Sequence, residues 1–401
     1  MAEITNAVIR KIIDSRGNPT AEVDIISNRA VGRASAPSGA SKGTFEVKDY
    51  PGGGIDQGIR AFERVAHMAV GMRLSDQKNF DAMLHEADGT NDFARIGGNV
   101  AVAMSLAYAK ASALSENMEL YQALSTGKAK SLPIPIGNII GGGRHAINGT
   151  TMQEFLSLAR AGSYSESAFA NVSVHKNAGK LLRGKFPQLS LGLGDEKAWV
   201  APLSDDEALE ILSDAIKAAS DETKADIGLS VDLAASEFCD NGTYSYGDRI
   251  LSTDEQIDFV ADLAQRFGIR SLEDPLDESD FDGFARLTKK IGSKTMIIGD
   301  DLFVTNKERL QKGIGMGAAN AILIKPNQIG TLSDMIDTVE LAKRSNYKTV
   351  ISHRSGETED STIAHLAVGL GIGYIKTGTI GGERTAKHNE LIRIEERMRN
   401  G

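Results

Sequence analysis

The chain has 401 residues, of which 41% are hydrophobic and 25% charged, and its formal net charge is −9. This composition is typical of a soluble globular protein with one large domain or two moderate ones. The acidic balance argues against nucleic acid or a membrane surface as a partner. Cys239 is the single cysteine, so no intrachain disulfide can form, and the N-terminal segment MAEITNAVIR lacks a signal-peptide pattern. We therefore expect a cytoplasmic protein.

The first third of the chain predicts a small α+β domain. PTAEVDIIS (19–27) and RAVGRASAP (29–37) alternate with the period of half-exposed strands. Residues 58–72 and 99–116 have helical periodicity, and the second of these helices is nearly apolar and should be buried. STGKAKSLPIP has the composition of a linker. We expect an N-terminal α+β domain over residues 1–130 and a catalytic domain over residues 131–401.

After about residue 200, short apolar strands alternate with amphipathic helices. This rhythm predicts a parallel sheet, either open or closed as an α/β barrel. Three helices carry a Ser/Thr-x-x-Glu/Gln start signal, for which we expect the pairs Ser204–Glu207, Thr253–Gln256 and Thr305–Glu308. The predicted strands are IGLSVDL, IRSLEDP, TMIIGDD, AILIKPN, TVISHRS and IGYIKTG.

A polar residue ends each of these six strands. In chain order they are Asp232, Glu273, Asp300, Lys325, His353 and Lys376. In a barrel the carboxyl ends of parallel strands converge on one mouth, where active sites lie. Three carboxylates gathered there would repel one another unless a hard divalent cation such as magnesium joined them. The alternative is that each acid caps the helix after its strand, as Asp301 could also do.

Lys325 follows the last of the three acids by one strand. Beside a divalent cation and Lys376 its pKa should be lowered, which suits a base that removes a proton from carbon. The alternative is a salt bridge to one of the acids. Arg354 and Ser355 in SHRSG suit a phosphate or carboxylate, and we expect His353 to contact the same substrate.

Three upstream loops contain further candidates. PSGASKG (37–43) is a small-residue loop that could close over a ligand. IIGGGRHAING is glycine-rich but lacks the GK[ST] ending of a nucleotide-binding P-loop. Glu154 in MQEF and Glu196 in GDEKAW are isolated glutamates, and composition alone predicts no function for them.

From about residue 14 to residue 396 the chain resembles the enolase family. The resemblance rests on motifs in the same order and spacing: SRGNPT, PSGAS, QEF, GDE, VDLAASEF, EDP, GDDL, KPNQIGT, SHRSGETED, IKTG and NELIRIEE. It implies a TIM-like, enolase-type α/β barrel that departs from regular (β/α)8 order at its start and is capped by the N-terminal α+β domain. It also implies reversible magnesium-dependent dehydration of 2-phospho-D-glycerate to phosphoenolpyruvate in glycolysis and gluconeogenesis. Two Mg²⁺ ions per active site and a homodimer or ring of dimers are implied as well.

The resemblance assigns a role to each candidate residue. Asp232, Glu273 and Asp300 match ligands of the first magnesium ion, and Ser41 matches a ligand of the second. Lys325 matches the base, and Glu196 matches the acid that assists hydroxide departure, with Glu154 beside it. The residues that match substrate contacts are Arg354 and Ser355 for the phosphate, Lys376 for the carboxylate, and His145, Gln153 and His353 along the site.

The chain departs from the family pattern in its loops. Enolases usually read GDEGGVAP, whereas this chain reads GDEKAWVAP, and Lys42 stands where threonine is usual. These changes leave two alternatives open. One is a sugar-acid dehydratase or racemase that uses the same carboxylate triad, and the other is a non-catalytic scaffold that kept the fold.

Overall fold

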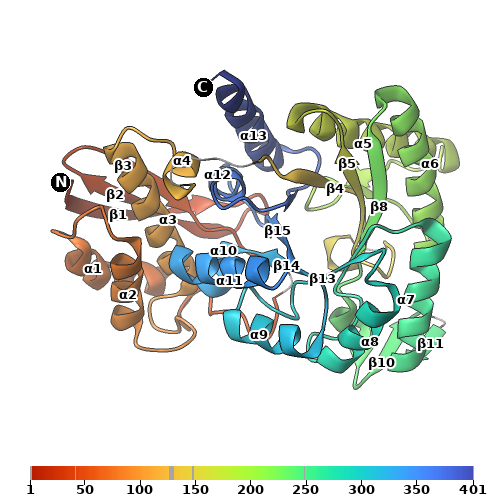
Figure 1. Cartoon of the computed structure of the whole chain (residues 1–401), viewed down its shortest axis with the longest axis horizontal. Helices are drawn as coiled ribbons and strands as arrows, with labels where there is room; N and C mark the ends of the chain where they lie inside the picture. The colour runs from red at the N-terminus through yellow and green to blue at the C-terminus, as the bar shows by residue number, and fades with distance from the viewer. Residues whose placement is uncertain (1, 41, 126–130, 147–148, 248, 401) are drawn as a thin grey trace.

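The computed structural model describes residues 2–40, 42–125, 131–146, 149–247 and 249–400. Figure 1 shows two parts side by side, an N-terminal part built on a small antiparallel sheet and a barrel wrapped by helices. The expected α/β barrel with an N-terminal α+β domain is therefore confirmed. The boundary after residue 130 stays a prediction, because residues 126–130 lie outside the described ranges. None of the described helices combines the length and apolar character that crossing a membrane requires.

In the N-terminal part, helices pack on one antiparallel sheet. Its strands are β1 (Ile4–Ile13), β2 (Pro19–Ser27) and β3 (Val31–Ser35). Its helices are α1 (Ile55–Ala69), α2 (Gln77–Asp88), α3 (Gly98–Ser115) and α4 (Leu120–Leu124). Most side chains of α3 are buried, as predicted for this apolar segment. Gly32 allows α3 to lie directly on β3, because a Cβ there would stand 2.0 Å from the carbonyl oxygen of Ala107.

The described residues of the C-terminal part close a barrel of eight strands. In order around the barrel these are β4 (Ile134–Gly141), β5 (Glu154–Arg160), β8 (Asp226–Asp232), β12 (Ser271–Glu273), β13 (Met296–Gly299), β14 (Ala321–Ile324), β15 (Lys348–Ser352) and β16 (Tyr374–Lys376). Strand β16 pairs with β4 and closes the ring. Strand β5 is antiparallel to both of its neighbours, whereas the other neighbouring pairs are parallel. The barrel thus departs from regular order at its start, as the resemblance implies.

Helices cover the outside of the barrel (Figure 1). They are α5 (Tyr164–Lys185), α6 (Asp205–Thr223), α7 (Thr253–Phe267), α8 (Phe281–Ile291), α9 (Lys307–Met316), α10 (Pro326–Ile329), α11 (Leu332–Arg344), α12 (Thr362–Gly369) and α13 (Gly382–Asn400). The smaller elements are η1 (Gly143–His145), β6 (Gly192–Leu193), β7 (Trp199–Val200), η2 (Ala235–Phe238), β9 (Cys239–Asp240), β10 (Thr243–Tyr246) and β11 (Arg249–Ser252). The sheet of β9, β10 and β11 was not expected from the sequence.

The six predicted strands are confirmed, and they bring their polar ends to one face. Strands β8, β12 and β16 end at Asp232, Glu273 and Lys376. Asp300, Lys325 and His353 directly follow β13, β14 and β15. Because these strands are parallel, all six residues lie at the carboxyl mouth of the barrel.

One of the three predicted helix starts is confirmed. Ser204 and Glu207 form the capping box of α6. The pair Thr253–Gln256 is wrong by one residue, because Ser252 and Glu255 form the box that begins α7. The pair Thr305–Glu308 is also wrong, since the side chain of Asn306 caps α9. The side chain of Thr305 is buried, and its hydroxyl donates a hydrogen bond to Oε1 of Gln328 at 2.8 Å instead of capping the helix.

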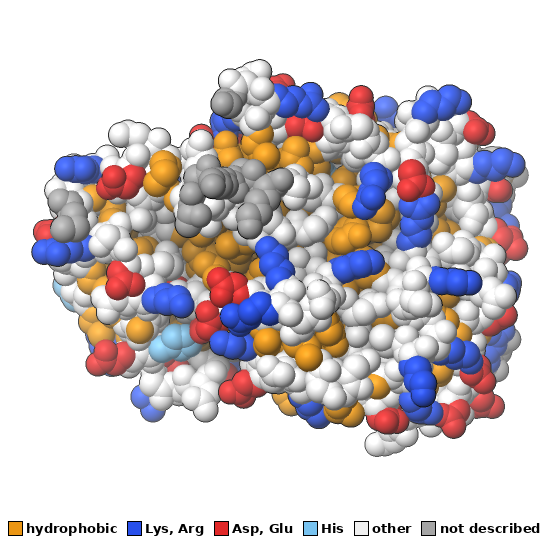
Figure 2. Space-filling model, in the orientation of Figure 1, with side chains coloured by type: hydrophobic (Ala, Val, Ile, Leu, Met, Phe, Trp, Pro, Cys, Tyr) orange, Lys and Arg blue, Asp and Glu red, His pale blue; other side chains and the backbone are white. Residues whose placement is uncertain are grey.

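Figure 2 shows basic and acidic side chains interspersed over one face of the molecule. Ion pairs such as Lys307–Asp337, at 3.0 Å, join many of the exposed charges. Exposed pairs of this kind each contribute about 0–1 kcal/mol. The fold therefore depends on its buried core and on the paired charges buried at the barrel mouth.

Candidate active site

A pocket lies at the carboxyl mouth of the barrel. It encloses about 30 Å³, which is room for about two water molecules. Its lining residues are Gly39, Ala40, His145, Gln153, Glu154, Glu196, Asp232, Ala234, Asp274, Asp300, Asp301, Lys325, Ser352, His353, Arg354, Ser355 and Lys376. Every described candidate residue from the sequence is among them except Glu273, which bonds directly to Lys376.

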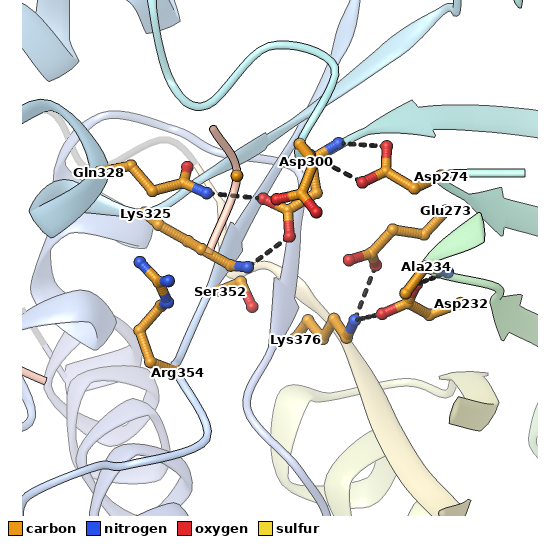
Figure 3. A network of polar contacts seen from close by, with 12 residues as sticks. Asp232, Ala234, Glu273, Asp274, Asp300, Lys325, Gln328, Ser352, Arg354 and Lys376 are labelled. Atoms are coloured by element: carbon orange, nitrogen blue, oxygen red, sulfur yellow. Dashed lines mark hydrogen bonds and ion pairs between the residues drawn. The ribbon is translucent and has the colours of Figure 1, made fainter. Parts of the chain in front are cut away.

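Lys376 joins the acids on one side of the pocket (Figure 3). Its Nζ lies 2.9 Å from Oδ2 of Asp232, 2.8 Å from Oε2 of Glu273 and 3.3 Å from Oε1 of Glu154. Burial by itself lowers the pKa of Lys376, but these carboxylates outweigh it and raise the pKa well above its usual value. Burial and the charge of Asp232 raise the pKa of Glu273. The resemblance assigns Lys376 to a substrate carboxylate, and here its ammonium group holds protein carboxylates.

Lys325 faces Asp300 across the same pocket. Its Nζ pairs with Oδ2 of Asp300, whose Oδ1 accepts a hydrogen bond from Nε2 of Gln328 at 2.9 Å. Burial lowers the pKa of Lys325, yet the charges of Asp300 and Glu273 prevail and raise it. The protein groups alone therefore raise this pKa, and the salt bridge considered as the alternative is present. The predicted lowering depends on a neighbouring cation and stays a prediction.

Asp274 is a site residue that the sequence motifs did not single out. Its carboxylate accepts the backbone N–H groups of Asp300 at 2.9 Å and of Asp301 at 2.7 Å (Figure 3). Its own backbone has a φ of 38°, which is unfavourable for a residue other than glycine. Asp274 thus fixes the turn that aims Asp300 into the pocket. Asp301 does not cap α9, since that cap is Asn306. The sequence signal that could have identified Asp274 was the EDP motif, in which it follows Glu273.

A second group of side chains gathers around Glu196. Potential ligand atoms of His145, Glu154 and Glu196 all lie within 4.8 Å of one another. Burial and the charge of Glu196 raise the pKa of Glu154. Burial also opposes ionisation of Glu196, but the hydrogen bond from His353 and the charge of Arg384 favour its ionised form and lower its pKa. The pKa shifts of these two neighbouring carboxyl groups therefore run in opposite directions.

His353 is held in one tautomer. Nη1 of Arg384 donates to its Nδ1 at 2.9 Å, so the ring proton is on Nε2, which lies 3.1 Å from Oε2 of Glu196. Burial lowers the pKa of His353 to about 4, and the positive charge of Arg384 acts in the same direction. The imidazole is therefore neutral at pH 7. Arg384 is fully buried, and no feature of the sequence marked it.

Arg354 and Ser355 are tied to the N-terminal part. The guanidinium of Arg354 makes a bidentate pair with Glu46, with Nη1–Oε2 at 2.9 Å and Nη2–Oε1 at 3.0 Å. Oγ of Ser355 accepts the N–H of Ala40 at 2.5 Å, and the backbones of Ser38 and Gly356 exchange two hydrogen bonds. Gly39 and Ala40 of the loop 37–43 line the pocket, and closure of this loop over a ligand stays a prediction. Its Ser41, the predicted second-metal ligand, lies outside the described residues. No sequence motif indicated Glu46.

The donor set of the pocket fits a hard divalent cation. Oε1 of Glu273 and Oε2 of Glu154 are buried and have no hydrogen-bond partner among the described residues. Potential ligand atoms of Asp274, Asp300 and Asp301 lie within 4.8 Å of one another. The predicted triad of Asp232, Glu273 and Asp300 does not form such a tight group within the described part of the chain, because the ammonium groups of Lys376 and Lys325 join its members instead. Carboxylate oxygens without nitrogen or sulfur donors favour magnesium, calcium or manganese.

Comparison with known proteins identifies the family. The model of the enolase N-terminal domain matches residues 4–124, and that of the enolase C-terminal TIM barrel domain matches residues 129–401. The chain belongs to the enolase family. Enolase from Picrophilus torridus is 50% identical over 397 residues, which cover 99% of each chain. Enolases from Halorubrum lacusprofundi (49% over 403 residues, 99% of each chain) and Methanothermobacter thermautotrophicus (50% over 402 residues, 98% of this chain and 97% of the relative) are similar.

The activity of the chain is accordingly that of an enolase, a lyase that acts on a phosphorylated small molecule with a divalent metal. The alternative of a sugar-acid dehydratase or racemase loses its support, because both parts of the chain match enolase models. The scaffold alternative rested on the altered GDE loop, and that loop keeps Glu196 in the pocket.

The buried neutral state of His353 predicts a dependence of stability on pH. The unfolded chain binds a proton at this histidine near pH 6.5, whereas the folded chain does so only near pH 4. The unfolded state therefore binds more protons in this window, and stability falls as the pH is lowered, by up to about 3 kcal/mol. We expect His353→Asn to flatten this dependence in urea denaturation between pH 7 and pH 4.5.

His67→Asn is the matched control, because His67 is exposed on α1 and should leave the dependence unchanged. Equal slopes for His353→Asn and the unaltered protein would contradict the assignment of His353 as a buried neutral residue.

Proposed function

We propose that this pocket interconverts 2-phospho-D-glycerate and phosphoenolpyruvate, with Lys325 as the base and Glu196, beside Glu154, as the acid. The observation that carries the proposal is that base and acid stand on opposite walls. Lys325 follows β14 and Glu154 begins β5, and in the barrel order β5, β8, β12, β13, β14 these strands are half the ring apart. A substrate between them presents one reacting carbon toward each group, as an elimination requires.

We assign Asp232, Glu273 and Asp300 to a first magnesium ion and Ser41 to a second. The buried oxygen of Glu273 without a partner supports the first assignment. The enolase resemblance of the PSGAS motif supports the second. When bound, magnesium supplies positive charge that stabilises the additional negative charge developing on the substrate carboxylate.

The proton and the leaving group can be followed atom by atom. In its neutral form Lys325 accepts the proton from carbon 2, and the electrons of that C–H bond form the double bond to carbon 3. The bond from carbon 3 to its hydroxyl breaks, and Glu196 gives the departing hydroxide a proton, so that water leaves. Burial and the charge of Glu196 raise the pKa of Glu154, so this pair of carboxyl groups can hold a proton that Glu196 passes on, which supports the role.

The remaining side chains would bind and orient the substrate. We assign its phosphate to Arg354 and Ser355, and its carboxylate to Lys376. The pair with Glu46 supports a fixed orientation of the Arg354 guanidinium. His145, Gln153 and His353 would line the substrate, which agrees with their burial in the pocket wall.

An activity assay with and without a chelator tests the function. With magnesium, 2-phosphoglycerate should give the absorbance of an enol product, a chelator should abolish it, and added magnesium should restore it. Unphosphorylated glycerate should give no turnover, because Arg354 and Ser355 then have no phosphate to hold. Turnover that survives the chelator, or none at saturating 2-phosphoglycerate, would refute the proposal.

Lys325→Ala tests the base. We expect turnover to fall by about 10³-fold or more, since a positioned general base contributes about 10²–10⁴-fold. The circular dichroism of the variant should remain that of the folded protein. Lys289→Ala removes an exposed lysine of α8 and should leave turnover unchanged. Retained activity in Lys325→Ala would exclude it as the base.

We further propose a homodimer or a ring of dimers in the cytoplasm, with the domain boundary after residue 130. Family membership supports the assembly, as do the exposed side chains of Ile13 and Val31, at 77% and 49% of their full exposure, on the N-terminal sheet. The single cysteine supports the location. Sedimentation equilibrium measures the assembly directly, and a monomer at micromolar concentration would reject it.

A further inference from the structure

Glu196 is carried by a short loop, residues 194–198, which we call the Glu196 loop. It connects β6 to β7, and the N–H of Lys197 donates to the carbonyl of Gly194 at 3.0 Å. The N–H of Gly194 donates to the carbonyl of Ala198 at 2.9 Å. Within this turn Lys197 has a φ of 61°, in the left-handed region that favours glycine. A lysine there weakens the turn, so the position of Glu196 needs support from outside the loop.

That support comes from helix α5. Nε2 of His175 donates to the carbonyl oxygen of Lys197 at 2.9 Å. Burial lowers the pKa of His175, so the imidazole is neutral. Its ring proton is on Nε2, because the carbonyl oxygen of Lys197 can only accept a hydrogen bond. Nε1 of Trp199, directly after the loop, donates to the carbonyl oxygen of His175 at 2.9 Å. His175 of α5 is thereby bonded both to Lys197 in the loop and to Trp199 directly after it.

The two rings also pack on each other. The imidazole of His175 and the indole of Trp199 are stacked, with centroids 5.3 Å apart and planes at 29°. Gly179 provides the seat for the indole, because a Cβ there would lie 2.4 Å from its Cζ2. The guanidinium of Arg183 also lies over the indole, 5.3 Å from the ring centroid.

We propose that His175 and Trp199 form a clamp that positions Glu196 for proton transfer in this chain. The clamp rests on the proposed role of Glu196 as the acid. Neither ring is part of the pocket lining, so both act through the backbone of Lys197 and not on the substrate. Inside the pocket, Glu196 is 3% exposed, and its Oε2 accepts a hydrogen bond from Nδ2 of Asn138 at 3.2 Å. Loss of the clamp displaces the acid and leaves Lys325 and the phosphate-binding residues in place.

Loss of the clamp should affect the two steps of the reaction, proton removal and hydroxide departure, differently. Removal of the proton from carbon 2 depends on Lys325, and it can be followed as exchange of that hydrogen with deuterated solvent. Departure of hydroxide from carbon 3 depends on Glu196. A displaced Glu196 therefore slows dehydration without slowing the exchange, and substrate affinity is retained. General damage to the fold would reduce all three together.

His175→Leu removes the donor to Lys197, and His175→Gln retains an N–H donor near the same place. In magnesium buffer with 2-phosphoglycerate, we expect kcat of His175→Leu to fall about tenfold or more, because a misplaced group costs up to about 10²-fold. Its KM and its deuterium exchange at carbon 2 should stay within about twofold of the unaltered protein. His175→Gln should recover most of kcat. Lys176→Leu alters the exposed neighbour on α5 and should change nothing.

Thermal unfolding establishes that each variant is folded. If His175→Leu does not fold, Trp199→Phe replaces it in the test, since phenylalanine keeps a ring on Gly179 but cannot donate to His175. The clamp is overturned if kcat is unchanged, if exchange falls as much as dehydration, or if His175→Gln is no better than His175→Leu. Absence of both exchange and dehydration in the unaltered protein would instead refute the proposed function.

Discussion

Buried charges at the barrel mouth must be balanced by opposite charges a few ångströms away, and this constraint organises the active site. An unpaired buried ion is costly, so each cation here is surrounded by acids. Lys376 joins Asp232 and Glu273, and Lys325 pairs with Asp300. Away from the pocket, Lys387 pairs with Glu357 at 2.8 Å. Removing one member of such a set leaves its partner buried and uncompensated, so the same side chains contribute to both the stability and the chemistry of the protein.

The same constraint connects the two parts of the molecule. Glu46 comes from the N-terminal part and balances Arg354 of the barrel, and both side chains are nearly fully buried. Ser38 exchanges two backbone hydrogen bonds with Gly356, and the N–H of Ala40 donates to Oγ of Ser355. The N-terminal part therefore completes the wall of the pocket, and the orientation of the proposed phosphate-binding arginine depends on it.

Repetition along the chain made the barrel predictable. Six apolar strands at regular spacing indicated a parallel sheet, and parallel strands bring their polar ends together. The residues that the sequence did not reveal, Asp274, Glu46 and Arg384, are single charges whose partners lie far away in the chain, and no local pattern marks such a pair. The shifted capping box at Ser252 has a different cause, because two adjacent residues, Ser252 and Thr253, both satisfy the motif. The pairing of Lys325 with Asp300, which raises the pKa of the lysine, could not be predicted either, because its two members follow different strands.

The reversed strand β5 changes where the chain can supply functional groups. Its first residue, Glu154, lies at the mouth beside Asp232, and its last, Arg160, lies beside Asp226 at the opposite end. Helix α5 therefore brings the chain back to the mouth, and α6 then runs to the opposite end of the barrel, where β8 begins. This return adds one crossing at the top of the barrel that a regular alternation of strand and helix lacks. Glu196 sits at that crossing, so a single inverted strand provides the place from which the acid reaches the substrate.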